Sequence, residues 1–387
     1  MLQRIDQSTS GATVRLVARA ELAALPAWQT AFAHERKDRR YYELTEDTLS
    51  EGFVYRYLVI ESGGAVRAIQ PCFVLDQDLL AGVGGLASRI VGGIRGVWKR
   101  FLFARTLMVG CVAGEGHLDG DEATQALTAA ALARELPRIA RELKCALVVL
   151  KEFPAKYRAT LEVLRDAGFA RVPSMPMTTL ALDYATFDDY LKTVSPRTRG
   201  KLRRKLRATD RADLITMEVV GDITPFVDEA YPLYKAVFDR SPMQFEKLTK
   251  DFLCEIGRRM PDKARFFLWR QDGRLIAFGL FTLEGDAICH DYVGFDYAVA
   301  FKLNLYYRVF HDVIEWALAR GCKRFYNGSL NYDPKWHLRQ SLYPTDLYAR
   351  HTSDAVNAVF KRILPVMEPT RSDPILPNFD NYRTLWE

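Results

Sequence analysis

The chain has 387 residues, which is too long for one ordinary core and favours two domains on a prior of roughly 150 residues each. Hydrophobic residues make up 49% and charged residues 26% of the chain, which excludes a disordered or fibrous protein. The net charge of +6 favours anionic partners such as phosphates, acidic lipid surfaces or nucleic acid, without choosing among them.

The cysteines and the start of the chain indicate a reducing compartment. No two of the six cysteines form a CxxC pair, and most lie in apolar runs, as buried thiols do. Met1–Gly11 is polar, so we expect no signal peptide, and no apolar run is long enough to span a bilayer. We therefore expect a cytoplasmic protein, with peripheral contact to the inner face of the membrane left open. The scattered histidines predict no metal site.

The first half is predicted to alternate helices and strands. Helices are expected at 20–32, 123–143 and 158–167, and strands at 53–61, 65–75, 105–112, 146–151 and 169–182. The strands 53–61 and 65–75 form a hairpin around a Ser-Gly-Gly turn.

The second half repeats this order. Helices are expected at 187–193, 197–211, 225–238, 245–259 and 301–319, and strands at 214–220, 265–270, 274–283, 287–294, 324–327 and 345–351. A hairpin, a further strand, a long helix and a short strand thus occur twice, which indicates two similar α/β modules with mixed sheets. We place the domains at 1–175 and 176–387, the second ending in a surface tail.

One stretch of the first domain, 79–104, is an unusual insertion. It is apolar, rich in glycine and basic, it carries Trp98 and Phe101, and no acidic residue occurs between Asp78 and Glu115. This composition is typical of a helix lying on a membrane surface or of the wall of an acyl-chain tunnel. An ordinary packed helix is the alternative, which we favour slightly less.

The second half also carries recognisable motifs. His290-Asp291-Tyr292-Val293-Gly294 ends a strand, a helix containing Asn304-Leu305-Tyr306-Tyr307 leads to Gly-Cys-Lys-Arg-Phe-Tyr, and Asn331-Tyr332-Asp333-Pro334-Lys335 follows. Over roughly 184–351 this pattern resembles the FemAB-like and BioF2-like N-acyltransferases of the GNAT superfamily. The resemblance implies an α/β (α+β) fold of tandem GNAT-like domains with mixed sheets. It also implies transfer of an acyl group from acyl-CoA, a cosubstrate rather than a tightly bound cofactor, to an amine.

The candidate bases are His290 and Asp291. Acyl transfer requires a proton acceptor for the amine and a donor for the oxyanion. The two residues are adjacent on a predicted strand, so at most one side chain faces the site. A histidine with its ordinary pKa of about 6.5 suits proton transfer near neutrality. A histidine simply packed in the sheet is the alternative.

Further site residues come from the resemblance. It places Asn327, Tyr332 and Lys335 near the acceptor, with Lys335 neutralising a phosphate or stabilising developing negative charge. Tyr332 or Tyr343 is expected to donate to the oxyanion or to the leaving thiolate, and Tyr292 to contact substrate. A tyrosine-rich surface loop with a solvated lysine is the alternative.

Two basic features are candidates for binding the donor's phosphates. A helix start near Phe301 would offer free amides, with Lys302 and Asn304 beside them, unless it is an ordinary crossover helix. The segment 197–207 is the densest positive charge, and Arg199 and Arg203 are the expected contacts. It would attract CoA phosphates or an anionic bilayer, or be only a solvated face. The lack of interleaved aromatics or a recognition helix disfavours tRNA, and DNA is not expected.

The glycine pair in Gly114-Glu115-Gly116-His117 is weak evidence for a phosphate or acyl loop. We interpret it as a plain loop, because Asp119 and Asp121 supply a helix N-cap signal that explains it.

The sequence therefore favours an N-acyltransferase acting on the amine of an amino lipid, with ceramide-synthase-like acylation of a sphingoid base as the specific hypothesis. A Fem-type transferase using aminoacyl-tRNA and a noncatalytic membrane-associated scaffold are the alternatives. The sequence leaves open the acyl length, the oligomeric state and which module binds the donor.

Overall fold

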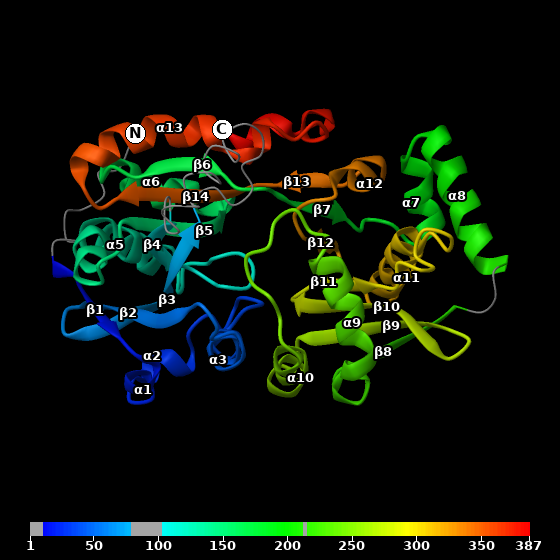
Figure 1. Cartoon of the computed structure of the whole chain (residues 1–387), viewed down its shortest axis with the longest axis horizontal. Helices are drawn as coiled ribbons and strands as arrows, with labels where there is room; N and C mark the ends of the chain where they lie inside the picture. The colour runs from blue at the N-terminus through cyan, green and yellow to red at the C-terminus, as the bar shows by residue number, and fades with distance from the viewer. Residues whose placement is uncertain (1–10, 79–102, 212–214) are drawn as a thin grey trace, which may run out of the picture. The chain divides into compact units, whose positions relative to one another are not determined.

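The computed structural model describes residues 11–78, 103–211 and 215–387, so most of the unusual insertion at 79–104 lies outside the described residues. The chain divides into two compact units. Unit 1 comprises Met1–Ser174 and Thr345–Pro369, and unit 2 comprises Met175–Pro344 and Thr370–Glu387 (Figure 1). No helix within the described ranges has both the length and the apolar character needed to cross a membrane.

Unit 1 is built on a mixed seven-stranded sheet of order β1-β2-β3-β4-β5-β14-β6. Its strands are β1 (Thr13–Val17), β2 (Val54–Ser62), β3 (Ala65–Asp78), β4 (Phe103–Val109), β5 (Leu147–Pro154), β6 (Ala170–Pro173) and β14 (Thr345–His351). Only β4 and β5 run parallel, and every other neighbouring pair is antiparallel. The predicted hairpin around the Ser-Gly-Gly turn is confirmed as β2 and β3.

Helices cover the sheet of unit 1. α5 (Glu122–Glu142) and α6 (Arg158–Asp166) pack with one face in a core that is rich in Leu, Val and Ala. α13 (Asp354–Met367) packs with the other face. The helix predicted at 20–32 is instead two short helices, α1 (Arg19–Leu22) and α2 (Pro26–Gln29), because Pro26 starts a new helix at its first turn. The sequence analysis missed α3 (Arg39–Thr48).

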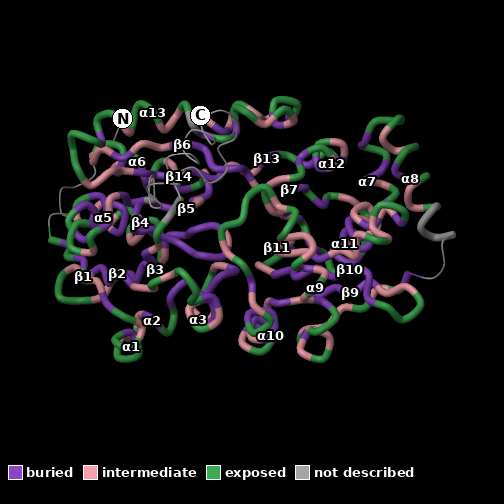
Figure 2. Tube along the Cα trace, in the orientation of Figure 1, coloured by how far each residue is buried: buried purple, intermediate pink, exposed green. Residues whose placement is uncertain are grey.

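Unit 2 has a mixed seven-stranded sheet of order β13-β7-β12-β11-β10-β9-β8. Its strands are β7 (Met177–Ala181), β8 (Thr216–Val220), β9 (Ala264–Gln271), β10 (Arg274–Glu284), β11 (Ala287–Phe295), β12 (Arg324–Asn327) and β13 (Ser341–Tyr343). Here β11 and β12 are the parallel pair. Strands of both sheets are largely buried (Figure 2).

The helices of unit 2 also lie on both faces of its sheet. α7 (Phe187–Thr193), α8 (Pro196–Arg211) and α11 (Leu305–Ala319) contribute to the large aromatic core. α9 (Val227–Phe238) and α10 (Lys250–Arg259) contact β9, β10 and β11. α12 (Tyr332–His337) follows β12. The C-terminal residues 370–387 pack on this unit through Leu376, Phe379 and Leu385. The predicted mixed α/β class with two mixed sheets is confirmed.

The strands of the two sheets follow the same order and have the same orientations when they are counted from β1 and from β8. In each sheet, the sixth strand in this count comes from a part of the chain outside the run of the first five. β14 lies between β5 and β6, and β7 lies between β12 and β13. The domain division at 175/176 matches the first crossing between units, yet 345–369 belongs to unit 1 rather than to the second domain. The physical reason is that β14 completes the hydrogen bonding of both β5 and β6, which would otherwise be open edges.

Candidate functional site

The parallel strands of unit 2 separate beyond their fourth residue pair. Their ladder runs from Ala287 opposite Arg324 to His290 opposite Asn327, where β12 ends. β11 continues to Phe295, and its pairing with β10 skips Asp291, which forms a β-bulge. Bulges re-aim side chains and are frequent beside active sites. The sheet therefore opens directly after His290 and Asn327.

Four polar residues gather at this opening, and we call them the unit 2 polar cluster: His290, Tyr306, Asn327 and Lys335. His290 and Asn327 are opposite each other in the ladder, so their side chains share the face covered by α11, which supplies Tyr306. Nε2 of His290 and the hydroxyl of Tyr306 are buried and make no hydrogen bond of good geometry among the described residues, although the Asn327 side chain interacts with both residues. Buried polar atoms are nearly always paired, and these two lie where the parallel strands separate, so we take the cluster as the candidate ligand site.

The environment shifts the pKa of each titratable member of the cluster. Burial, followed by the nearby positive charge of Lys335, lowers the pKa of His290 to about 3. Burial lowers the pKa of Lys335 to about 7 and raises that of Tyr306. Hydrogen bonding with Asn327 raises the pKa of His290 and lowers that of Tyr306, so it opposes the effect of burial in both. His290 is therefore neutral near pH 7, and the sequence-based expectation of an ordinary histidine pKa is wrong.

Lys335 is held back over the end of β12. It is 3% exposed, and its Nζ donates to the backbone oxygen of Gly328. The turn that returns the chain toward this point contains two consecutive residues in the left-handed region, Leu330 at φ 67° and Asn331 at φ 52°. A branched residue such as leucine is strained at this φ, and such strain concentrates at functional sites. The alternative of a solvated lysine in a surface loop is therefore wrong.

The other predicted catalytic and substrate residues have different surroundings. Asp291 accepts a 2.6 Å hydrogen bond from Thr282, and Tyr292 donates at 2.6 Å to Glu246. Tyr332 is buried and its hydroxyl donates to the backbone oxygen of Pro176 at 2.8 Å.

Tyr343, the remaining predicted substrate residue, packs edge-on against Tyr326, with ring centroids 5.0 Å apart. The structure thus brings together His290, Asn327 and Lys335 from the predicted set and adds Tyr306. Sequence pattern alone did not distinguish Tyr306 from its neighbour Tyr307.

The predicted phosphate site at the start of the crossover helix differs from the structure. α11 begins at Leu305 rather than near Phe301, and its N-cap Asn304 has φ 49°. The backbone amides of residues 303, 304, 305, 307 and 308 donate to carbonyls of residues 299, 301, 300, 304 and 304 respectively. These five amides are therefore engaged within the chain, and phosphate binding at this helix start stays a prediction. Phe301 and Lys302 are exposed on the preceding turns.

The basic helix α8 matches its predicted pattern. Leu202 is buried in the core of unit 2, and Leu206 packs beside it. Arg203 pairs with Asp188 at 3.2 Å, and Arg199 donates to the backbone oxygen of Lys192 at 3.5 Å. Both predicted phosphate contacts are thus engaged at least in part within the chain.

Unit 1 has an apolar row where unit 2 has the polar one. The ladder of β4 and β5 also has four pairs, and its fourth pair is Val109 opposite Leu150. Leu150 in turn lies opposite Tyr348 of β14, as Asn327 lies opposite Thr178 of β7. Val109 and Leu150 are fully buried in the core of unit 1. The equivalent position in unit 1 therefore carries no proton-transfer group.

The opening itself is filled in unit 1 by the loop that follows β4. Its Gly116 amide donates to the Glu152 oxygen of β5. Carbonyl oxygens of the loop accept bonds from buried side chains: Ala113 from Tyr41, Gly114 from Lys151, Glu115 from Lys37 and His117 from Gln70. Asp121 caps α5 as predicted, accepting from the Thr124 amide at 2.9 Å.

Buried charges hold this loop, and we call Glu35, Arg36, Lys37, Glu115 and His117 the unit 1 ion network. Glu115 lies 2.6 Å from Arg36 and 2.8 Å from Lys37, and His117 lies 3.1 Å from Glu35. Burial alone would raise the pKa of Glu115, but the two cations hold it well below its usual range. The prediction of a plain loop at residues 114–117 lacked these contacts, because the partners of Glu115 lie 78 and 79 residues away in the chain.

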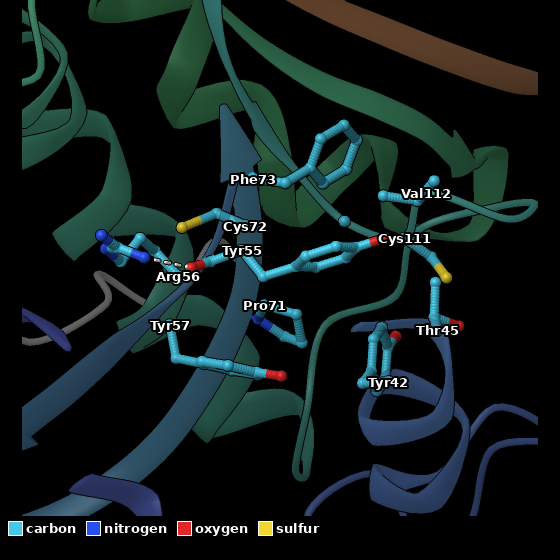
Figure 3. Close-up of a pocket in the computed structure, with 11 residues that line it drawn as sticks. Tyr42, Thr45, Tyr55, Arg56, Tyr57, Pro71, Cys72, Phe73, Cys111 and Val112 are labelled. Carbon is cyan, nitrogen blue, oxygen red and sulfur yellow. Dashed lines mark hydrogen bonds between the residues drawn. The ribbon is translucent and has the colours of Figure 1, made fainter. Parts of the chain in front are cut away.

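A small cavity of about 10 Å³ in unit 1 lies between α3, the strands β2 and β3, and the start of the loop after β4 (Figure 3). Its lining includes Tyr42, Tyr55, Cys72 and Cys111. The hydroxyl of Tyr42 is buried without a hydrogen-bond partner among the described residues. The volume corresponds to about one water molecule, so the cavity cannot accommodate a substrate. All six cysteines are buried and unbridged, as expected for reduced thiols.

Comparison with known proteins places the chain in a family. A model of the FemAB_like family, described as peptidoglycan biosynthesis/recognition, matches residues 111–354. Two curated relatives from Mycobacterium tuberculosis strains, both called putative 8-amino-7-oxononanoate synthase 2, are 23% identical over 237 residues. That match covers 58% of this chain but only 30% of the relatives' length.

Among solved structures, FemX has a similar fold. FemX superposes with a TM-score of 0.52 at 10% identity, covering 83% of this chain and 93% of FemX. A tandem GNAT protein from the clavulanic acid biosynthesis pathway gives a TM-score of 0.47 at 13% identity, over 88% of this chain and 99% of that protein. The C-terminal domain of a putative lysylphosphatidylglycerol synthetase from Agrobacterium fabrum gives 0.48 at 16% identity, over 68% and 84% of the two chains. At such identities the likeness to FemX shows the fold alone.

Proposed function

The chain is a member of the FemAB_like family, and we propose that it is an N-acyltransferase whose chemistry takes place in unit 2. The observation that carries this proposal is the unit 2 polar cluster at the opening between β11 and β12. It combines a buried amine whose pKa is about 7 with a neutral histidine and a tyrosine hydroxyl that make no hydrogen bond of good geometry apart from their interaction with Asn327. Unit 1 has no such set at the equivalent strand positions.

We assign the proton-accepting role to Lys335. A general base works best when its pKa lies near the operating pH, and burial places Lys335 there. His290, with a pKa of about 3, is a poor acceptor for a proton from an ammonium group. Its buried Nε2 and the hydroxyl of Tyr306 are better suited to hydrogen bonding with the reacting carbonyl and the intermediate formed from it.

The proposed reaction is balanced without a metal or a redox partner. The acceptor's nitrogen attacks the carbonyl carbon of a thioester, and a C–N bond forms. Neutral Lys335 takes the proton released by that nitrogen. The tetrahedral intermediate collapses, the C–S bond breaks, and Lys335 returns its proton to the leaving thiolate. The products are an amide and a free thiol, and the enzyme is unchanged.

We further propose an amino lipid as the acceptor, with ceramide-synthase-like acylation of a sphingoid base as the specific case. Support comes from large apolar side chains exposed on the segments that flank α9, β11 and α11: Met243, Phe245 and Phe301, the last 80% exposed. The two segments are linked where Arg240 stacks on Tyr297, 4.2 Å from its ring centroid. An acceptor with a long hydrocarbon chain would cover such side chains.

A second donor is favoured by one observation. Several amides at the start of α11 already donate to carbonyls, and Asp121 accepts from the Thr124 amide at the start of α5, so fewer amides remain there for a CoA pyrophosphate. An aminoacyl ester, as in a Fem-type transferase, needs no such site. The same cluster would then release an RNA hydroxyl instead of a thiol.

Thiol release from acyl-CoAs of increasing chain length tests both donors. The purified chain is assayed against a panel of amines that includes a long-chain amino alcohol, with His290→Ala as the matched variant. Release that requires a long acyl-CoA and the amino alcohol, and that falls about 10²–10³-fold in the variant, supports lipid N-acylation. No release with any pair, but amide formation from a charged tRNA, would replace acyl-CoA by the aminoacyl donor.

A further inference from the structure

The outward face of α13 in unit 1 is apolar, which is unusual for a surface helix. Four aliphatic side chains at helical spacing are strongly exposed, and we call them the α13 stripe: Val356 (49%), Val359 (55%), Ile363 (48%) and Val366 (80%). Figure 2 shows exposed positions along this helix. Positions three, seven and ten residues apart lie on one side of a helix, so the four side chains form a continuous strip.

The stripe is not the face that attaches α13 to unit 1. That attachment uses Phe360 and Leu364, which pack against Phe73, Met108 and Val149. It also uses Asn357, whose side chain donates to the Gly168 oxygen and accepts from the His351 amide. The helix thus presents apolar side chains both inward and outward. Contiguous exposed apolar patches of this kind mark interaction surfaces.

Beyond its first residue, α13 carries charges of one sign only. After Asp354, which pairs with Arg350 at 2.6 Å, no acidic residue occurs before Glu368, and the exposed charged side chains between them are Lys361 and Arg362. Arg362 borders the stripe, because it lies three positions from Val359 and four from Val366. A cation beside an exposed aliphatic strip complements an anionic, apolar partner.

A second copy of the chain fits this surface poorly. In a two-fold symmetric contact along the stripe, the axis would pass near its middle, at residues 361 and 362, and would bring the Arg362 side chains of the two copies together. Like charges meeting in an interface oppose association. A bilayer of anionic lipids instead gives the aliphatic side chains a hydrocarbon environment and the arginine a phosphate neighbour.

We propose that the α13 stripe is a membrane-docking surface that inserts Val356, Val359, Ile363 and Val366 into the interface of an anionic bilayer, with Arg362 at the level of the phosphates. This surface belongs to unit 1 and is distinct from the unit 2 polar cluster. Its role does not depend on which acyl donor the enzyme uses.

Co-sedimentation of the full chain with lipid vesicles tests the proposal. Vesicles of phosphatidylcholine alone are compared with vesicles that also contain phosphatidylglycerol. We expect binding to the anionic vesicles, weakened by salt, and a loss of about tenfold or more in the double variant V359D/I363D, because two of the four apolar anchors are removed. Val54→Asp, at an exposed valine of β2 whose neighbours Phe53 and Tyr55 pack in the cluster under α13, is the matched control and should bind as the natural chain does.

Thermal unfolding and solution mass distinguish the other possible occupants. If V359D/I363D lowers the melting temperature sharply, the stripe packs against another part of the same chain, and the proposal is wrong. A concentration-dependent dimer that the double variant abolishes would equally overturn it in favour of a second copy. Arg362→Glu leaves the aliphatic side chains in place and should still weaken binding to anionic vesicles; unchanged binding in both variants would also reject the docking surface.

Discussion

The two units share the order and orientation of their strands but differ in the side chains at their parallel strand pairs. At the fourth pair of the parallel ladder, unit 1 has Val109 and Leu150, and unit 2 has His290 and Asn327. Beside these pairs, unit 1 holds a loop whose buried carboxylate, Glu115, is paired with Arg36 and Lys37. Unit 2 holds a buried lysine, Lys335, that has no carboxylate partner in the described residues.

The difference teaches how to separate a structural polar network from a site. Removing charges from water is costly, and ion pairs and hydrogen bonds recover part of that cost. Glu115 recovers part of it within unit 1, through Arg36 and Lys37. Lys335 has no carboxylate partner among the described residues of unit 2, and burial disfavours its charged form. Buried polar atoms without a hydrogen bond occur in both units, for example in Tyr42 and Tyr348 of unit 1, so it is the unpaired lysine that favours unit 2 as the location of the chemistry.

The largest effect on rate is expected at a buried lysine of unit 2, and a buried lysine of unit 1 serves as the comparison. Lys335→Met should lower kcat/KM by about 10²–10⁴-fold, the usual contribution of a general base, while the protein stays folded. Lys37→Met in unit 1, at a lysine paired with Glu115 at 2.8 Å, should lower stability and leave kcat per folded molecule unchanged. Steady-state kinetics and thermal unfolding of both variants check this pair. A large rate loss in Lys37→Met would place chemistry in unit 1 as well.

The next effect concerns the centre of the unit 1 ion network. Glu115→Ala leaves Arg36 and Lys37 buried without their carboxylate, so the free energy of unfolding should fall by about 3–5 kcal/mol. The control is Glu162→Ala, which removes an exposed pair with Arg165 and should cost at most about 1 kcal/mol. Chemical denaturation measures both. Equal small losses in the two variants would mean that the network does not hold the loop.

The pH dependence of stability and of rate reports directly on Lys335. Its pKa is about 7 in the folded protein and has the ordinary value of 10.5 when unfolded, so between these values the unfolded chain binds more protons. Stability must then rise with pH in that window, by at most about 1.4 kcal/mol per pH unit from this group. The difference between the natural chain and Lys335→Met isolates that slope. For a base, kcat/KM should also rise with pH to a plateau above about 7, and a fall there would assign Lys335 a cationic role instead.

The smallest effect comes from making unit 2 resemble unit 1. Asn327→Leu copies the residue found at the equivalent position, Leu150, and removes an amide beside His290 and Tyr306. We expect a loss of about tenfold in kcat, the value of roughly one hydrogen bond, with stability unchanged or higher. Asn327→Gln keeps the amide and should recover part of the rate. A variant with full activity would exclude Asn327 from the site.

Much of the fold could be predicted from local pattern. Alternating apolar residues around Ser-Gly-Gly and Asp-Gly turns gave both hairpins, and Asp121 and Gly321 marked helix ends close to where the structure has them. The candidate site was predicted in part: His290, Asn327 and Lys335 were named, and their family motif gave their proximity. From the sequence the base was His290 or Asp291, whereas the proposal from the structure assigns the base to Lys335. The two differ because a pKa depends on burial and neighbours that no motif encodes.

The sequence by itself determined the mixed α/β class, the repeat of two modules and the family to which the chain belongs, because these follow from periodicity, turn chemistry and short motifs. Only the tertiary structure decided where β14 pairs, that Lys335 is buried without a carboxylate partner in the described residues, and that Glu115 is bound by Arg36 and Lys37. The physical reason is distance along the chain: these outcomes depend on contacts between residues that are neighbours only after folding. A carboxylate that is expensive to bury alone becomes stable when two cations from far upstream reach it, and a lysine without such partners remains available for chemistry.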